Sequence, residues 1–263
     1  MRILLTNDDG INAEGLTALR NIAFSLSDDV WVCAPEAEQS GASRALTLSD
    51  PVRVRKLDER TFAVSGTPTD CVRLALTELI PVPKPDLVLS GVNRGQNLGE
   101  DVTMSGTVAG AIEGMIWGVP SIALSQSMRL YRDDVVIRYE NAEAYAPGII
   151  QKLIEVGWPA EVVINLNFPD RPPEADTQVE LTVQGRHDMA GLRTEKRTDL
   201  RGRDYYWLGF TGREARPEPG TDLAAIEAGR ISVTPLHIDL THRETLAKLK
   251  GKLGGAPPKA VAR

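Results

Sequence analysis

The stretch Arg2-Ile3-Leu4-Leu5-Thr6-Asn7-Asp8-Asp9-Gly10 decides the fold of this chain. Its first five residues are mostly apolar and predict a short buried strand, which the polar residues from Asn7 onward end abruptly. Apolar residues then recur at three- and four-residue spacings from Leu16 to Leu26, and the apolar run 30–35 predicts a second strand. Strand, helix and strand in this order predict a βαβ unit, which implies a parallel sheet with a right-handed crossover.

The alternation of strands and helices continues along the chain. We expect a hairpin of short strands at 53–55 and 62–64, a helix capped by Thr69 and Asp70 that runs to about Leu79, a strand at 86–90, a helix at 105–117 and a strand at 121–125. This pattern predicts an α/β fold with a doubly wound, Rossmann-like, mostly parallel sheet over residues 1–128.

Residues 129–263 are expected to complete the sheet and to add a smaller C-terminal elaboration. The stretch 170–220 is polar and rich in Arg, Pro and Gly, and we interpret it as a hairpin excursion used for oligomer contacts, with 205–208 as its best strand. The other predicted elements are helices at 141–156, 221–228 and 241–253 and strands at 162–166 and 231–234. The tail from Gly254 onward is predicted to be disordered.

Composition narrows the possible functions. Hydrophobic residues make up 42% and charged residues 25% of the chain, so a sizeable core can form. The formal charge of -6 and the aromatic content of 5% argue against long nucleic acids as partners. No apolar run approaches the roughly 18 residues of a membrane span, and the N-terminal run is too short for a signal peptide. We therefore expect a soluble, cytoplasmic protein without a membrane partner, whose Cys33 and Cys71 are buried, reduced thiols.

Three polar clusters directly follow predicted strands: Asn7–Gly10, Glu36–Gly41 and Ser90–Gly95. In an open α/β sheet, ligands bind outside the carboxyl ends of the strands. Because these clusters share that edge of the sheet, we expect them to converge on one site.

Asp8 and Asp9 are the strongest candidates for metal ligands. Two adjacent carboxylates at the end of a buried strand repel each other unless a cation neutralises them, and Mg²⁺ or Mn²⁺ suits such an oxygen-rich site. Asn93 would add an amide oxygen and Ser40 a hydroxyl. The alternatives are structural: the aspartates could cap the following helix, Asn93 could be a turn residue, and Ser40 could be a loop residue or a helix cap.

An anion site is predicted at Ser105-Gly106-Thr107, where a helix begins. Small residues with free backbone N–H groups, together with the two hydroxyls, suit a phosphate. The alternative is an ordinary helix cap with small residues for close packing. The glycine pattern matches neither a dinucleotide nor a nucleoside-triphosphate loop.

Other catalytic chemistries lack their sequence patterns. His187, His237 and His242 lie outside the three clusters, have no metal-ligand spacing, and are expected to be solvated or core residues. The nucleophilic-serine motif Gly-x-Ser-x-Gly is absent, and neither cysteine has a candidate base close to it in the sequence.

Taken together, these clusters resemble the SurE family, the survival-protein nucleotidases. The resemblance covers about residues 1–240, is weakest over 129–220, and is carried by Leu4–Ile11, Ala34–Gly41, Gly66–Val72, Ser90–Asp101, Ser105–Val108, Gly118–Ala123 and Gly229–Leu236.

Position by position, the resemblance implies that Asp8, Asp9, Ser40 and Asn93 hold one divalent metal ion per subunit, Mg²⁺ or Mn²⁺. It also implies that Asn97 and the turn Ser105-Gly106-Thr107 receive the substrate phosphate. The implied activity is a metal-dependent 5′-nucleotidase acting on nucleoside 5′-monophosphates, with broader phosphatase or exopolyphosphatase activity in some members. The implied assembly is a homodimer or homotetramer in which the C-terminal segment is exchanged.

The mechanistic hypothesis is an in-line displacement at phosphorus, in which Asp8 orients or deprotonates the attacking water or attacks as a nucleophile itself. Two rival hypotheses differ from it. A haloacid-dehalogenase-like phosphatase would also place Asp after a strand, but normally as Asp-x-Asp. A nucleotide-sensing module would bind the same ligands without turnover.

Overall fold

The computed structural model describes residues 1–131, 134–174, 176–187, 192–210 and 217–253. The strands of its main sheet are β1 (Arg2–Thr6), β2 (Asp29–Pro35), β3 (Val54–Lys56), β4 (Thr61–Val64), β5 (Leu87–Arg94), β6 (Ser121–Gln126), β9 (Val162–Phe168), β10 (Val179–Leu181) and β13 (Ile231–His237). They lie in the order β10-β13-β9-β6-β5-β1-β2-β4-β3. Two further pairs, β7 (Arg129–Tyr131) with β8 (Asp134–Val136) and β11 (Leu192–Thr198) with β12 (Asp204–Phe210), form separate sheets.

Strand β1 lies at the point where the order of the sheet reverses. It pairs in parallel with β2 on one side and with β5 on the other, so the chain builds outward first in one direction and then in the opposite one. Among the pairings of the main sheet, only β3 with β4 and β13 with β9 are antiparallel. The predicted doubly wound, mostly parallel α/β fold is confirmed, and the carboxyl end of β1 faces the crevice that such a reversal creates.

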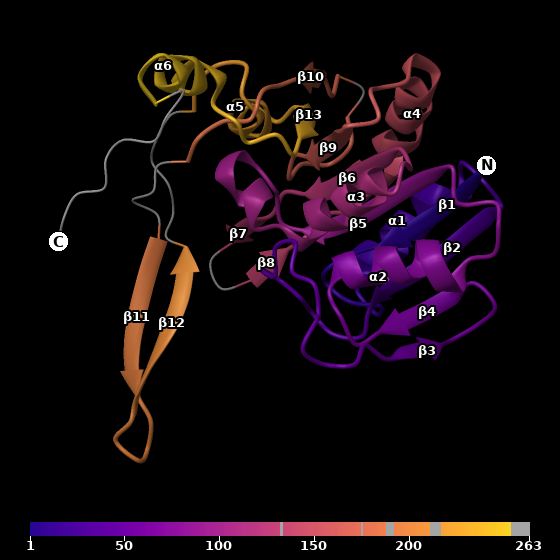
Figure 1. Ribbon diagram of the computed structural model, residues 1–263, viewed down its shortest axis with the longest axis horizontal. Coiled ribbons are helices and arrows are strands. Elements are labelled where there is room, and N and C mark those ends of the chain that lie inside the picture. The colour runs from indigo at the N-terminus through magenta and orange to yellow at the C-terminus, as the bar shows by residue number, and fades with distance from the viewer. Residues whose placement is uncertain (132–133, 175, 188–191, 211–216, 254–263) are drawn as a thin grey trace.

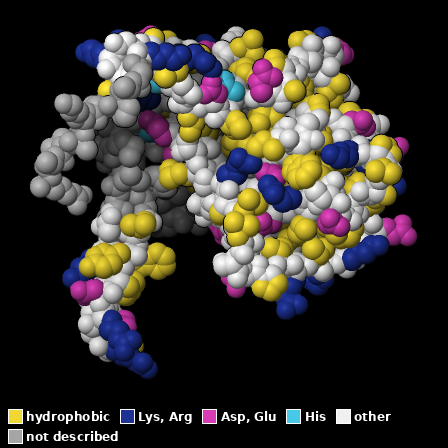
Figure 2. All heavy atoms as spheres, viewed as in Figure 1, with side chains coloured by type: hydrophobic (Ala, Val, Ile, Leu, Met, Phe, Trp, Pro, Cys, Tyr) yellow, Lys and Arg dark blue, Asp and Glu magenta, His cyan; other side chains and the backbone are white. Residues whose placement is uncertain are grey.

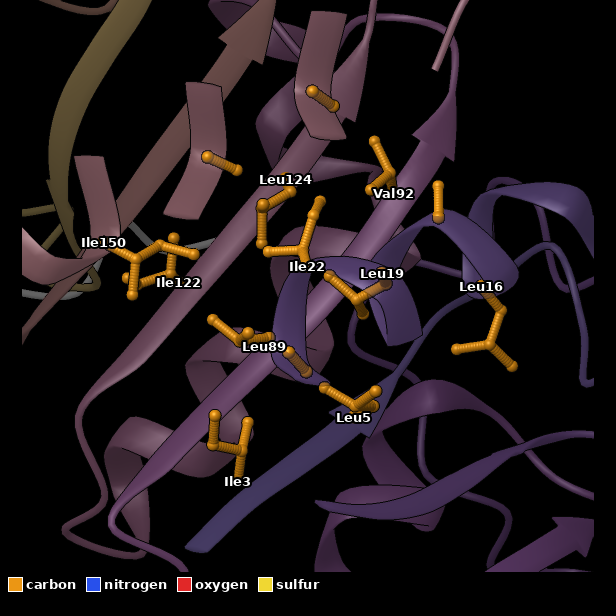
Figure 3. Packing of buried hydrophobic residues seen from close by; sticks show 14 of the residues in the cluster. Ile3, Leu5, Leu16, Leu19, Ile22, Leu89, Val92, Ile122, Leu124 and Ile150 are labelled. Atoms are coloured by element: carbon orange, nitrogen blue, oxygen red, sulfur yellow. The ribbon is translucent and has the colours of Figure 1, made fainter. Parts of the chain in front are cut away.

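Helices cover both faces of the main sheet (Figure 1). The covering helices are α1 (Glu14–Phe24), α2 (Pro68–Leu74), α3 (Gly106–Ile116), α4 (Glu140–Val156) and α5 (Asp222–Glu227). Helix α6 (Arg243–Leu253) follows the last strand and has no buried residue. Helices α1 and α4 pack on one face, where Leu16, Leu19 and Ile22 meet apolar side chains of the central strands (Figure 3). Helices α2 and α3 pack against each other and on the opposite face.

Helix α3 lies unusually close to the sheet because one of its sides is made of glycine. This glycine face consists of Gly106, Gly110 and Gly114. A Cβ on the second would lie 2.8 Å from Ser90 Oγ, and a Cβ on the third 2.5 Å from Ser121 Oγ. A Cβ on the first would lie 2.7 Å from the Cβ of Asp8. The glycine face therefore places the start of α3 directly on the end of β1.

Two local predictions were wrong. The helix predicted to be capped by Thr69 and Asp70 is capped by Thr67, whose hydroxyl accepts from Asp70 N while the Asp70 side chain accepts from Thr67 N. Threonine and a carboxylate three residues apart form this reciprocal capping box. The strand predicted to end at Ser90 continues to Arg94, so Asn93 belongs to β5.

The C-terminal half adds strands to one edge of the sheet and an extended hairpin. Strand β12 includes the predicted 205–208, whereas the position of its partner in the hairpin, β11, and the short β10 were not predicted. The hairpin points away from the body of the molecule (Figure 1), and apolar side chains are visible on it (Figure 2). Its Tyr206, Trp207 and Leu208 are exposed. The division at residue 128 stays a prediction, and the tail predicted to be disordered lies outside the described residues.

None of the helices in the described ranges combines the length and apolarity that crossing a bilayer requires. Cys33 and Cys71 are buried and free, as predicted.

Replacing Gly114 by alanine should destabilise the protein by pushing α3 away from the sheet. The new Cβ would lie 2.5 Å from Ser121 Oγ and 2.8 Å from Val88 Cγ2. Overpacking of this kind costs about 1–3 kcal/mol, which outweighs the gain of about 1 kcal/mol in helix propensity. We expect denaturant unfolding to show a lower free energy of unfolding for Gly114→Ala.

The matched control is Gly148→Ala in α4, where a Cβ would meet nothing within 4 Å. It should raise the free energy of unfolding by up to about 1 kcal/mol. Equal effects of the two substitutions would show that α3 is not held at this close distance.

Candidate active site

Asp8 occupies the centre of the site, at the carboxyl end of β1. Its side chain is only 4% exposed and accepts a hydrogen bond from the Thr107 hydroxyl in the first turn of α3. Its backbone carbonyl accepts from Gln39 N at 2.7 Å, which anchors the loop after β2. One residue thus joins β1, α3 and the loop that carries Ser40.

Ionisation of the Asp8 and Asp9 carboxyl groups is unfavourable in this environment. Burial raises the pKa of Asp8 from its ordinary 3.8 to about 6; the hydrogen bond from Thr107 lowers it and the neighbouring charge of Asp9 raises it further. Burial also raises the pKa of Asp9, and the negative charge of Glu38 adds to that effect, while Arg94 opposes it. A cation bound between the two carboxylates would relieve both costs.

The loops after β2 and β5 reach the same position. Arg94 N donates to Asp9 Oδ2 at 3.1 Å, which joins the end of β5, next to Asn93 in the sequence, to Asp9. Arg94 Nη2 also lies 3.8 Å from Glu38 Oε1. The structure therefore brings together the three polar clusters predicted to converge, and their assignment as metal ligands stays a prediction.

The neutral candidate ligands keep oxygen atoms available. Asn93 donates through Nδ2 to Gly95 O at 2.8 Å, so its Oδ1 is not used in that bond. The exposed Ser40 donates to Glu38 Oε1 at 2.8 Å and retains its lone pairs. Over the ranges that the structure describes, no three His, Cys, Asp or Glu side chains gather so as to hold a metal ion. A metal here would thus rest on two carboxylates and neutral oxygens.

The predicted anion turn is both a helix cap and a neighbour of Asp8. The Ser105 hydroxyl accepts from Val108 N at 3.1 Å, so this serine is the N-cap of α3. The Thr107 hydroxyl donates to Asp8. The Ser105 hydroxyl is used there as an acceptor and keeps its own O–H, whereas the Thr107 backbone N–H already bonds the Asp8 carboxylate. The donors that these contacts leave for an anion are therefore the Ser105 O–H and the Gly106 N–H.

Asn97 lies farther along the same edge of the sheet. It is 7% exposed, and its Nδ2 donates to Ser125 Oγ at 2.8 Å at the end of β6. Because β6 is two strands from β1, these ends are about 10 Å apart. A phosphate that contacts both Asn97 and the start of α3 would lie over the end of β5, between them.

Several residues near this edge were missed from the sequence. Asn165 and Asn167 of β9 bond the backbone of Asn97. The buried Asp222 accepts from Gly99 N at 2.9 Å. His187, expected to be a solvated or core residue, packs against the same loop, with its Nε2 3.0 Å from Leu98 O. The two asparagines could have been found from the sequence, because the pattern Asn-x-Asn is unusual in a buried strand. Asp222 and His187 show no such local pattern, and only the tertiary structure brings them to this loop.

A cavity of about 230 Å³ lies between α3 and the last strands of the sheet, where Val108 and Ile112 line it together with Val163 and Leu236. Ser105 lines it, but Asp8 and Asp9 do not. It is therefore separate from the carboxylate centre.

Known proteins resemble this chain over nearly its whole length. Residues 3–191 match the family described as survival protein SurE. A protein of Caulobacter vibrioides named 5′-nucleotidase SurE is 69% identical over 261 residues, which cover 99% of each chain. A protein of the same name from Parvibaculum lavamentivorans is 53% identical and covers 97% of this chain and 91% of its own. The crystal structure of the SurE protein from Aquifex aeolicus has a TM-score of 0.81 at 40% identity, covering 95% of this chain and 99% of that chain.

The raised pKa of Asp8 predicts a pH-dependent stability in metal-free protein. The Asp8 carboxyl group has a pKa of about 6 in the folded state and of about 3.8 in the unfolded state. Because the folded state binds the proton more tightly, the stability that Asp8 contributes is fully present below pH 3.8 and is lost as the pH rises through 6. Between pH 4 and 7 the loss should be about 2 kcal/mol. Guanidinium unfolding of EDTA-treated protein across this range measures it.

Asp8→Asn, which has nearly the same shape and no charge, is the comparison. Its free energy of unfolding should fall less over the same pH range, by the amount due to Asp8. Parallel pH curves for the two proteins would contradict the assigned pKa.

Proposed function

The chain belongs to the SurE family, and from this premise we propose that it is a metal-dependent 5′-nucleotidase that hydrolyses nucleoside 5′-monophosphates to a nucleoside and phosphate. The relatives named 5′-nucleotidase SurE match it over almost their full length. The reaction class is accordingly phosphomonoester hydrolysis. The observation that carries the proposal is the meeting of Asp8, Asp9 and the start of α3 at the reversal point of the sheet.

The donor set fits a hard divalent cation. Asp8, Asp9, Ser40 and Asn93 offer oxygen atoms only, which is the ligand type that Mg²⁺ and Mn²⁺ prefer. The pKa of Asp8 near 6 supports the fit, because a buried carboxylate with a raised pKa gains most from a neighbouring positive charge. When bound there, the cation would polarise a phosphate oxygen and lower the pKa of a water molecule.

The protein's own groups position the reacting atoms. The N–H groups that begin α3 face a phosphate held above the end of β5, where the positive end of the helix dipole stabilises negative charge. Asn97 has one further N–H on Nδ2 after its bond to Ser125, and the proposal assigns that donor to the same phosphate. Holding the phosphate at fixed donors supplies much of the rate enhancement.

Thr107 fixes the orientation of Asp8. Its hydroxyl donates to Oδ1 and so holds the carboxylate in one orientation. We assign the other oxygen, Oδ2, to a metal, a water molecule or phosphorus. Asp8 then acts either on the attacking water, by orienting or deprotonating it, or directly as a nucleophile. Trapping of an aspartyl-phosphate distinguishes the two roles.

The finer features of the proposal are one Mg²⁺ or Mn²⁺ per subunit, activity on further phosphate esters or polyphosphate, and assembly as a homodimer or homotetramer. The exposed apolar hairpin of β11 and β12 is compatible with subunit contacts, since an isolated two-stranded hairpin is only marginally stable in water. The cytoplasmic location and the absence of long nucleic acid and membrane partners stay predictions.

A phosphate-release panel tests the activity. We expect phosphate from AMP or GMP with Mn²⁺ or Mg²⁺, and none after EDTA treatment. Asp8→Asn should lower kcat by roughly 10²-fold or more, because the site loses both a metal ligand and the group that serves the attack. Nucleotide binding without phosphate release would favour the sensing alternative instead.

The matched control is Asp28→Asn, the same chemical change at an exposed position just before β2, on the opposite edge of the sheet. Its activity should equal that of the unchanged protein. Full activity of Asp8→Asn in metal-stripped and refilled enzyme would overturn the assignment of Asp8.

A further inference from the structure

Strand β9 carries two asparagines where a buried strand normally carries apolar residues. Its sequence is Val-Val-Ile-Asn-Leu-Asn-Phe, and all residues after the first are buried. Side chains alternate along the strand, so Ile164, Leu166 and Phe168 enter the core beneath α1 and α4. Asn165 and Asn167 point to the other face and are 0% exposed. A fully buried carboxamide is costly unless its hydrogen bonds are made.

Both asparagines bond to the backbone of Asn97. Asn97 N donates to Asn167 Oδ1 at 2.8 Å, while Asn97 O accepts from Asn167 Nδ2 at 3.1 Å and from Asn165 Nδ2 at 2.9 Å. The Asn167 side chain therefore bonds both the backbone N–H and the backbone C=O of Asn97. In a sheet, the backbone of a neighbouring strand would make these two bonds. Because Asn97 lies beyond the end of β5, this carboxamide pair replaces a strand pairing that the loop cannot make.

The side chain of Asn97 is held by a different strand. Its Nδ2 donates to the buried Ser125 Oγ of β6 at 2.8 Å. Backbone and side chain of Asn97 are thus fixed separately, by β9 and β6. The second N–H and the Oδ1 of its amide take no part in these contacts, and that N–H is the group assigned to the phosphate in the proposed function.

We propose that Asn167, assisted by Asn165, is a positioning residue that fixes the backbone of Asn97 so that its amide meets the phosphate of the substrate. The inference rests on the proposed function, in which Asn97 contacts that phosphate. Neither asparagine touches the substrate. Their effect passes through Asn97, and a displacement of about 1 Å of such a group can cost 10²-fold in rate.

A double-mutant cycle tests this dependence. Asn97→Ala and Asn167→Ala should each lower kcat/KM for AMP by about 10-fold or more, and the double variant should be no worse than Asn97→Ala alone. Residues that act on the reaction independently would instead multiply their effects. Multiplied losses overturn the proposal.

Two binding measurements separate positioning from general destabilisation. The dissociation constant of inorganic phosphate, measured by calorimetry with Mn²⁺ present, should rise by a similar factor in both single variants. The dissociation constant of Mn²⁺ itself should not change. An Asn167→Ala protein with normal phosphate binding overturns the proposal, as does one whose Mn²⁺ binding weakens in step with its phosphate binding.

Asn141→Ala is the matched control. Asn141 of α4 is also 0% exposed and donates through Nδ2 to a backbone carbonyl, Pro169 O, at 2.8 Å. It should lose similar stability but keep kcat/KM and phosphate affinity. If Asn167→Ala does not fold, Asn165→Ala provides the cycle, because it removes one of the bonds to Asn97 O and leaves both bonds of Asn167. Asn165→Ala should lower kcat/KM and phosphate affinity less than Asn167→Ala does. In a protein that already carries Asn97→Ala, it should lower neither.

The outcomes distinguish the two levels of inference. Hydrolysis of AMP by the unchanged protein, together with an Asn97→Ala variant that binds phosphate normally, would overturn the positioning role and leave the nucleotidase activity standing. A protein that neither hydrolyses AMP nor binds phosphate would overturn the proposed function and the positioning role with it.

Discussion

The close contact between α3 and the sheet is the constraint on which the site depends. Three glycines at four-residue spacing leave no side chain between the helix and the strands, so the start of α3 rests on the end of β1. Thr107 can then reach Asp8, and the first N–H groups of the helix lie beside the carboxylates. A helix with ordinary side chains on that face would stand farther from the sheet, and the two halves of the site would separate.

This arrangement concentrates opposing charges at one edge of the sheet. Buried carboxylates there have raised pKa values, whereas the helix start next to them attracts anions. The buried carboxylates alone are unfavourable, and the helix start alone attracts anions without selecting among them. Together they suit a ligand pair of a cation and a phosphate, because each ligand offsets the charge that the other leaves behind. The burial of apolar side chains in the rest of the fold offsets the free energy lost at these carboxylates.

The sequence predicted what depends on local pattern. The apolar runs and helical spacings indicated the order of strands and helices, and the strand ends indicated Asp8, Ser40 and Asn93. It did not predict contacts that tertiary structure creates: the bonds of Asn167 to Asn97, the position of His187, or β11, whose pairing with β12 is not marked by apolar alternation. The cap of α2 was predicted wrongly for a different reason. Thr67 and Thr69 are both threonines close to the start of the helix, and only the hydrogen bond between Thr67 and Asp70 identifies Thr67 as the cap.

The anchoring of the loop at Gly99 has a consequence for how the protein is made. Asp8 is among the first residues to be synthesised, but the loop beyond β5 needs β9 for Asn97 and the carboxylate of Asp222 for Gly99 N. While the chain is growing, β1 and β2 can pair early, and the carboxyl end of the sheet around Asn97 and Gly99 stays incomplete until α5 has been synthesised. A nascent chain in which Asp8 and Asp9 have already come together therefore still lacks the contacts that complete the proposed site.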